Sequence, residues 1–255
     1  MTTFATTTTG RVRHSFDPAA VEVLLCDADG NLFPSEEPAF VASAQVTNRC
    51  LAVLGVTRRY GAEELRLTTT GKNFRTTIVD LAHEAGLRDA LSRDALEHWV
   101  AEERSAVSTH LARTLTPDPA VREPLLRLAQ RFELAAVSSS ALARLDACFS
   151  ATGLAELFPP QRRFSAEDSL PVPTSKPDPA IYTFAGRELG VGASNALAVE
   201  DSVPGALSAV AAGFQTIGNV AFVPAAERSE RVDALYAAGV IAVVDSWSEL
   251  EALLS

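Results

Sequence analysis

A short apolar run near the start of the chain limits the possible folds more than any other stretch. It covers residues 21–26 and ends at two carboxylates and a glycine, Asp27, Asp29 and Gly30. Apolar residues without polar alternation predict a strand that is buried on both faces of a parallel sheet. Ligands bind at the carboxyl ends of such strands, so the two acids mark a candidate site. A polar turn that only closes a strand has the same composition, and this stretch alone leaves both interpretations open.

The composition predicts a folded chain that binds neither nucleic acid nor a membrane. The 255 residues are 47% hydrophobic, which is enough to bury one large core or two smaller ones. The formal net charge of -10 disfavours both kinds of polyanionic surface, because basic residues are too few to neutralise their phosphates. The three cysteines, Cys26, Cys50 and Cys148, lack metal-ligand spacing and are expected to be buried thiols.

The N-terminal residues carry no targeting pattern. Residues 1–18 are rich in threonine and lack the apolar segment of a secretory signal. No apolar run in the chain approaches the roughly 18 residues of a membrane span. We therefore expect a flexible N-terminal extension over 1–18 and a cytoplasmic location.

The pattern of the chain changes after residue 114. Helical, amphipathic patterns fill the segment before it, at 37–54, 62–67, 73–85 and 93–111. Short apolar runs alternate with helical segments after it, at 133–137, 163–165, 195–199, 214–217 and 240–244. Strands and helices in alternation predict an α/β fold with a doubly wound parallel sheet, similar to the Rossmann fold.

The long helical segment is best explained as an inserted domain. A crossover between neighbouring parallel strands takes roughly 30 residues, and a far longer stretch separates Cys26 from Glu133. We therefore predict an α/β catalytic core made of 19–35 and 115–255, with an all-helical cap domain at 36–114. The cap is expected to lie over Asp27 and Asp29.

Several predicted strands end in polar residues that should meet at one edge of the sheet. These residues are Asp27, Asp29, Ser138, Lys176, Glu200 and Asp201. One lysine cannot balance four acids, and two carboxylates about 4 Å apart repel by about 4 kcal/mol at an effective dielectric near 20. A hard divalent cation resolves this repulsion, and Mg²⁺ is the usual one where a substrate phosphate completes its coordination.

With such an ion the residues suit phosphoryl transfer. Asp27 can attack phosphorus to form an acyl phosphate that water hydrolyses. Asp29 would protonate the leaving oxygen and later take a proton from water. Ser138 would bond the phosphoryl oxygens, while Lys176 and Mg²⁺ neutralise their charge.

Four motifs in the expected order resemble the haloacid dehalogenase superfamily, in the subfamily with a helical cap after the first strand. They are Asp27-Ala-Asp-Gly-Asn-Leu, Ser138, Lys176 within Lys-Pro-Asp-Pro, and Glu200-Asp201 before Ser-Val-Pro-Gly. The resemblance implies that Asp27 is the nucleophile and Asp29 the acid/base. It also implies that Mg²⁺ is held by Asp27, by the backbone carbonyl of Asp29, and by Glu200 and Asp201.

The resemblance also suggests substrate-binding residues. Gly30 and Ser139 are expected beside the phosphoryl group. In the cap, the glycine turn at 70–75 carries Lys72 and Arg75, which would grip a second anionic group or sugar hydroxyls. A solvated helix N-terminus explains these two cations equally well.

The first motif departs from the usual pattern at three positions, Ala28, Asn31 and Pro34. The first two lie beside the nucleophile, where they would alter packing or activity, and Pro34 lies at the entry to the cap. None of the three removes a catalytic group.

Asp29 separates the possible activities, because dehalogenases of this architecture generally lack that second acid. The leading interpretation is a phosphatase that acts on a small phosphorylated metabolite. The alternative is a sugar phosphomutase similar to β-phosphoglucomutase. A third interpretation, a phospho-ligand binding protein without turnover, rests on Ala28 and Asn31. The sequence does not indicate the substrate or the oligomeric state.

Overall fold

A computed structural model gives the fold of the chain. It describes the residues 6–7, 10–11, 17–69, 73–88 and 90–255. The chain divides into two compact units, here called the core unit (Met1–Pro34 with Thr116–Ser255) and the helical unit (Ser35–Leu115).

A six-stranded parallel sheet forms the centre of the core unit, in the order β5-β4-β3-β6-β7-β8. Its strands are β3 (Val23–Cys26), β4 (Glu133–Ser138), β5 (Arg163–Ser165), β6 (Ala196–Glu200), β7 (Gln215–Asn219) and β8 (Ala242–Val244). The predicted fold class, a doubly wound parallel α/β sheet, is confirmed.

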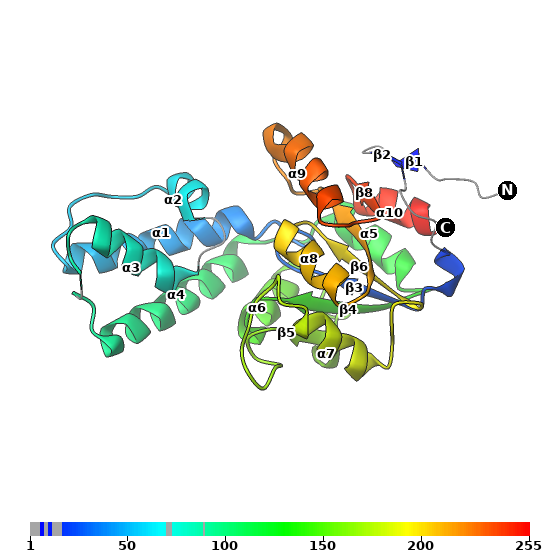
Figure 1. The fold of residues 1–255 in the computed structure, drawn as a ribbon, viewed down its shortest axis with the longest axis horizontal. Helices are drawn as coiled ribbons and strands as arrows, with labels where there is room; N and C mark the ends of the chain where they lie inside the picture. The colour runs from blue at the N-terminus through cyan, green and yellow to red at the C-terminus, as the bar shows by residue number, and fades with distance from the viewer. Residues whose placement is uncertain (1–5, 8–9, 12–16, 70–72, 89) are drawn as a thin grey trace. The chain divides into compact units, whose positions relative to one another are not determined.

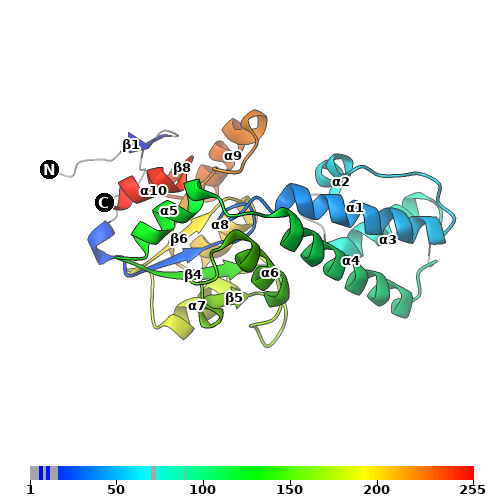
Figure 2. The same ribbon diagram turned by 180° about the vertical axis from the view of Figure 1, so that it is seen from behind.

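Helices cover both faces of this sheet. They are α5 (Pro119–Leu128), α6 (Leu142–Thr152), α7 (Ala180–Leu189), α8 (Val203–Ala211), α9 (Ala225–Ala237) and α10 (Trp247–Leu254). Figures 1 and 2 view the unit from opposite sides, with α7 and α8 over one face and α5 and α10 over the other. This double cover explains the apolar strands, since all four residues of β3 are buried.

The helical unit contains α1 (Glu36–Val53), α2 (Ala62–Thr69), α3 (Phe74–Glu84) and α4 (Arg93–Thr114). Side chains that cap helix N-termini fix two of its boundaries. Asn73 accepts a hydrogen bond from the Thr76 N–H at the start of α3, and Ser92 accepts one from the Ala95 N–H at the start of α4. The unit has its own apolar core, which includes Leu51, Leu65 and Ile78 among others. The expectation that it covers the site remains a prediction.

The N-terminal segment is described only in part. Most of 1–18 lies outside the described residues, but Thr6–Thr7 (β1) pairs antiparallel with Gly10–Arg11 (β2), and a short 3₁₀ helix follows at Pro18–Ala20. Another 3₁₀ turn, Pro160–Arg162, precedes β5.

Among the described helices, none combines the length and apolar character that crossing a bilayer requires. All three cysteines are buried and unpaired, as expected.

Candidate active site

The register of the sheet brings the predicted acids to one edge. Cys26 at the end of β3 is level with Val199 in β6, so Asp27 and Glu200 follow at the same height. The Asp27 N–H also donates to the Val199 carbonyl at 2.9 Å, which extends the pairing by one residue. Pairing between two buried strands therefore sets the separation of the two carboxylates.

Three carboxylates form a buried cluster at this edge. One oxygen from each of Asp27, Glu200 and Asp201 lies within 4.8 Å of the others, and all three residues are buried. Glu200 Oε2 and Asp201 Oδ1 are buried and find no hydrogen-bond donor among the described residues. Buried carboxylate oxygens normally have partners, so these two atoms are suited to a cation.

Two glycines leave room for these carboxylates. A Cβ atom on Gly205 would lie 1.8 Å from Glu200 Oε2, and one on Gly30 would lie 2.4 Å from Asp201 Oδ2. Gly30 also has a φ of +78°, which L side chains rarely adopt. The close neighbour of Gly30 in the structure is thus a carboxylate of the cluster. Its expected contact with a phosphoryl group remains a prediction.

Lys176 lies inside the cluster and is almost fully buried. Its ammonium donates to Asp27 Oδ1 at 2.5 Å, to Glu200 Oε1 at 2.6 Å and to the Val137 carbonyl at 2.7 Å. These three acceptors match the three protons of an ammonium. The lysine therefore ties the end of β3 to the ends of β4 and β6.

The acids of the cluster carry more negative charge than one lysine neutralises. Burial raises the pKa of the Asp27 carboxyl from 3.8 to about 7; Lys176 opposes this shift and Glu200 adds to it. Burial also raises the pKa of Asp201 well above its ordinary value, with contributions from Asp27 and Glu200. Burial would lower the pKa of Lys176, but its two carboxylate partners raise it instead, so the lysine stays protonated. Either protons or a cation must supply the missing positive charge.

Tyr182 in α7 supports Glu200 from behind. Its hydroxyl donates to Glu200 Oε1 at 2.5 Å, and its ring lies 5.1 Å from the Lys176 ammonium. Burial and the Glu200 carboxylate raise the pKa of this phenol well above its ordinary value, so it remains a donor. Tyr182 was not among the predicted site residues, although it follows Lys176 closely on a helix with a buried face.

Asp29 lies in a different environment from Asp27. Ser140 Oγ donates to Asp29 Oδ2 at 2.7 Å, and Arg144 Nη2 donates to Asp29 Oδ1 at 2.8 Å. The side chains of Asp29 and Arg144 are 24% and 26% exposed. Arg144 lies in the first turn of α6, directly after the serines of the second motif, and this position was the available sequence signal for it.

The serines of the second motif shape the backbone around the site. Ser138 Oγ accepts a hydrogen bond from the Ser140 N–H at 3.0 Å, and Ser139 Oγ accepts one from the Lys176 N–H at 3.1 Å. Ser139 thus holds the segment that carries Lys176. The expected contacts of Ser138 and Ser139 with a substrate remain predictions.

Asn31, one of the three departures in the first motif, joins the ends of neighbouring strands. Its side chain is fully buried and donates to the carbonyls of Asp27 at 3.0 Å and Val199 at 3.1 Å. Asn219, at the end of β7, donates to Asn31 Oδ1 at 2.8 Å. The Trp247 indole donates to the Asn31 carbonyl at 3.0 Å. Asn31 therefore fixes the backbone beneath Asp27 against β6, β7 and α10.

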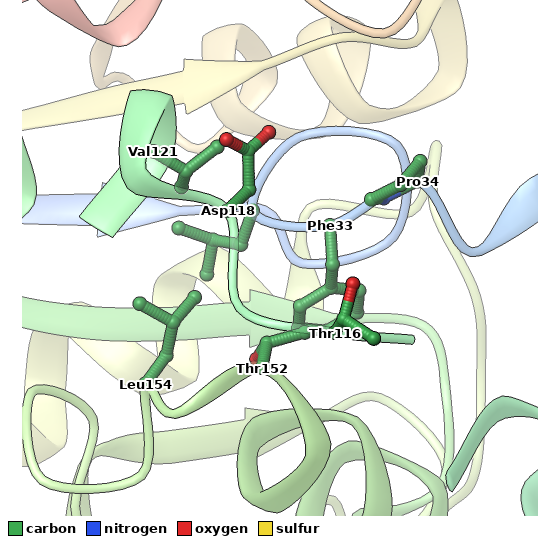
Figure 3. A pocket seen from close by; sticks show the side chains of 8 residues that line it. Phe33, Pro34, Thr116, Asp118, Val121, Thr152 and Leu154 are labelled. Carbon is green, nitrogen blue, oxygen red and sulfur yellow. The ribbon is translucent and has the colours of Figure 1, made fainter. Parts of the chain in front are cut away.

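The other two departures have apolar side chains and lie in the described part of the core unit. Ala28 is fully buried within the turn that follows β3. Pro34 lines a small cavity in the core unit, together with Phe33, Thr116 and Leu154 among others (Figure 3). Its volume of about 10 Å³ is near the minimum for one water molecule. This cavity is too small for a substrate.

Two residues of the predicted cap, Lys72 and Arg75, were expected to bind substrate. Lys72 lies outside the described residues. Arg75 pairs through both terminal nitrogens with Glu97 of α4, at 2.6 and 2.7 Å. A role of Arg75 in binding substrate remains a prediction.

These contacts define a class of protein: an α/β protein whose strand ends combine an acid cluster suited to a cation, a buried lysine and a second, partly exposed carboxylate. Comparison with known proteins agrees with this class. Residues 21–213 match the haloacid dehalogenase-like hydrolase family. The chain is 31% identical to protein CbbY of Cereibacter sphaeroides over 241 residues, which are 91% of this chain and 95% of that protein.

Two solved structures agree along most of the chain. A haloacid dehalogenase family hydrolase from Deinococcus radiodurans, with bound phosphate and sodium, has a TM-score of 0.63 and 27% identity, over 92% of this chain and 96% of its own. A variant of CbbY from Rhodobacter sphaeroides, in complex with xylulose-1,5-bisphosphate, has a TM-score of 0.66 and 25% identity, over 90% and 96% of the two chains.

The chain belongs to the haloacid dehalogenase-like hydrolases. The predicted superfamily and the predicted enzyme class, a phosphoric monoester hydrolase of this family, are confirmed. A putative β-phosphoglucomutase from Thermotoga maritima is also similar, with a TM-score of 0.66 and 25% identity, over 91% of this chain and 98% of its own.

Proposed function

We propose that this chain is a Mg²⁺-dependent phosphatase that hydrolyses a small sugar phosphate through an aspartyl phosphate on Asp27. The observation that carries the proposal is the buried cluster of Asp27, Glu200 and Asp201 with its two unpaired oxygens. A site of this kind is unstable without a cation and becomes neutral when it holds one.

The donor set fits Mg²⁺. All the available ligand atoms are carboxylate oxygens, which hard divalent cations prefer. Asp27, Glu200 and Asp201 would hold the ion, and the backbone carbonyl of Asp29 would complete the protein ligands. When bound, Mg²⁺ polarises a phosphoryl oxygen and neutralises its developing charge.

Asp27 is the proposed nucleophile. Lys176 holds its Oδ1 atom, and Asn31 holds its backbone carbonyl, so the carboxylate is oriented before a substrate arrives. Its attack forms a bond to phosphorus while the ester P–O bond breaks. Water then hydrolyses the aspartyl phosphate and releases inorganic phosphate.

Asp29 is the proposed acid and base. It would donate a proton to the leaving oxygen in the first step and accept one from water in the second. Both of its oxygens accept hydrogen bonds in the structure, from Ser140 and Arg144. Asp29 cannot donate a proton in that arrangement, so these contacts must change during turnover.

The substrate class is inferred from the relatives. The similar CbbY structure holds xylulose-1,5-bisphosphate, and the Deinococcus structure holds phosphate. We therefore expect a small phosphorylated metabolite, with a sugar phosphate as the first choice. The predicted cytoplasmic location and the oligomeric state remain untested.

The test is a screen of phosphorylated metabolites for phosphate release, with and without Mg²⁺. We expect release from at least one sugar phosphate, lost with EDTA and lost in Asp27→Asn. Activity that persists in full in that variant, or without divalent metal, would contradict the proposal.

The same assay separates the mutase alternative. With a hexose 1-phosphate, phosphorus NMR should show inorganic phosphate as the only new signal for a phosphatase. A 6-phosphate product would instead support the phosphomutase.

A further inference from the structure

The ammonium of Lys176 makes three hydrogen bonds within the protein. Its three hydrogen bonds go to Asp27, Glu200 and the Val137 carbonyl, and its side chain is only 5% exposed. An ammonium carries three donors. In this arrangement all donors of the lysine are occupied, so it offers none to a phosphate unless these contacts rearrange, and donors from other groups would strengthen phosphate binding.

The charge of the site leads to the same conclusion. Lys176 and the divalent cation of the proposed function would together balance the three carboxylates of the cluster and leave no positive charge over. A phosphate monoester is close to a dianion at neutral pH. Its charge remains uncompensated unless a further cation lies at the place where the ester binds.

Arg144 is such a cation. Asp29, as the proposed acid, must come within hydrogen-bond distance of the ester oxygen. Arg144 Nη2 lies 2.8 Å from Asp29 Oδ1, so the guanidinium is one hydrogen bond away from the group that reaches the ester. Both side chains are about a quarter exposed, in contrast to Lys176, so a small ligand can reach them.

The chemistry of the two donors fits a phosphoryl group. A guanidinium presents five N–H donors in a planar fork that matches phosphate oxygens. Ser140 offers a hydroxyl beside it, bonded to the other oxygen of the same carboxylate at 2.7 Å. The carboxylate of Asp29 thus occupies two donors that would equally suit two oxygens of a phosphate.

We propose that Arg144 is a substrate-binding residue, whose guanidinium exchanges the Asp29 carboxylate for phosphoryl oxygens of the ester, with Ser140 as its neighbouring donor. The exchange compensates the charge of the substrate and releases the oxygens of Asp29 for proton transfer. This proposal rests on the phosphatase function proposed above, because it takes Asp29 to act at the ester oxygen.

Binding of inorganic phosphate to the full chain in the presence of Mg²⁺, followed by calorimetry, tests the exchange. Arg144→Met should weaken phosphate binding about tenfold or more, the scale of a lost hydrogen bond between charged groups. Arg144→Lys should recover part of the loss. Arg187→Met is the matched control, because Arg187 pairs with Glu188 on the exposed side of α7. This variant should bind phosphate as tightly as wild type.

A double-variant cycle separates direct binding from an effect through Asp29. Asp29→Ala should bind phosphate several-fold more tightly than wild type, because the competing carboxylate is gone. Adding Arg144→Met should abolish this gain. If Arg144→Met changes the affinity less than twofold in the Asp29→Ala background, Arg144 only positions Asp29 and the proposal is wrong.

Hydrolysis of p-nitrophenyl phosphate distinguishes this failure from a failure of the proposed function. Wild-type turnover that depends on Mg²⁺ and on Asp27 supports the function, and a raised KM in Arg144→Met then supports the role of Arg144. The same wild-type turnover with an unchanged KM in Arg144→Met overturns the role of Arg144 alone. A wild-type chain that hydrolyses no phosphate ester overturns both.

Discussion

Asp27 and Asp29 are separated by one residue, yet their surroundings differ in almost every respect. Asp27 is buried, faces Glu200 and Asp201, and shares the Lys176 ammonium with Glu200. Asp29 is partly exposed and is held by Arg144 and Ser140. One carboxylate is thus part of a buried, hydrogen-bonded cluster, and the other belongs to a pair that solvent and small ligands can reach.

This difference explains how two identical side chains can serve two roles. A nucleophile benefits from a fixed position beside a cation, and Lys176 and the backbone contacts of Asn31 supply that fixation. An acid/base must exchange protons and change partners during turnover, which an accessible pair allows. Different environments of neighbouring acids are the usual way to separate such roles.

The assignment of separate roles to Asp27 and Asp29 would fail if Asp27 were dispensable. Asp27→Asn keeps the shape of the side chain but removes the nucleophilic oxygen, so kcat should fall by roughly 10⁴-fold or more. Turnover of a sugar phosphate measures the fall in kcat. Trapping by acid quench shows whether the chain is still phosphorylated. Asp233→Asn, an exposed position on α9, is the control and should keep wild-type turnover. A phosphorylated Asp27→Asn chain would contradict the assignment.

The role of Asp29 depends on the leaving group. Asp29→Ala should slow hydrolysis of a sugar phosphate by about 10²-fold, the scale of general acid catalysis. A p-nitrophenolate leaves without a proton, so the aryl ester should lose much less. Comparison of kcat for the two esters makes the measurement. Equal losses for both would mean that Asp29 does not act as the acid.

Asn31 belongs to the buried surroundings of Asp27. Asn31→Ala leaves the Asn219 amide without its buried acceptor and frees the Asp27 carbonyl, so the free energy of unfolding should fall by about 2 kcal/mol. Urea denaturation measures this change. Asn195→Ala removes hydrogen bonds of a more exposed asparagine and should cost less. Equal losses in the two variants would show that burial of the Asn31 network adds nothing.

The fold was largely predictable from the sequence, since the strands are short and apolar and the helices are amphipathic. The run predicted at 133–137 forms β4, and the pattern predicted at 93–111 forms α4 with three further residues at its end. Ends of elements were less predictable, because capping depends on local contacts. The helical pattern predicted at 73–85 forms α3, which begins at Phe74, where the Asn73 side chain accepts a hydrogen bond from the Thr76 N–H.

The site was predictable only where a motif carries it. The structure brings together Asp27, Lys176, Glu200 and Asp201 because strand register places them at one edge. The Asn31–Asn219 bond joins residues 188 positions apart, and no periodicity signals such a pair. The structural role of Asn31 could therefore not be predicted from the motif, because it depends on partners in β6, β7 and α10.

A substitution of Tyr182 tests how far the buried acid cluster depends on the hydrogen bond from Tyr182 to Glu200. Tyr182→Phe keeps the ring beside Lys176 but removes the donor to Glu200 Oε1. Loss of a partner that orients a metal ligand typically costs 10-fold or more, so Mg²⁺ affinity should fall about tenfold. Titration of activity with Mg²⁺ measures it, and kcat at saturating Mg²⁺ should change less. An unchanged Mg²⁺ requirement would show that Lys176 alone orients Glu200.

The smallest expected effect concerns pH and comes from the cluster alone. The pKa of Asp27 is raised from 3.8 to about 7, chiefly by burial, and that of Asp201 is raised too. Without metal the folded chain therefore binds more protons than the unfolded chain between about pH 4 and 7. The contribution of Asp27 to stability is full below about pH 4 and is lost as the pH rises through about 7.

Mg²⁺ replaces those protons, so it should stabilise the chain more at high pH than at low pH. The rise in Tm on adding Mg²⁺ should be larger at pH 7.5 than at pH 5.5, by roughly 3 °C for a shift near 1 kcal/mol. Differential scanning calorimetry measures it, and Asp27→Asn should reduce the difference because one of the titrating ligands is gone. Arg144→Met should leave the difference intact, since Arg144 contacts Asp29 on the exposed side. A difference that disappears in Arg144→Met would mean that the two carboxylates titrate as one unit and that their environments are not independent.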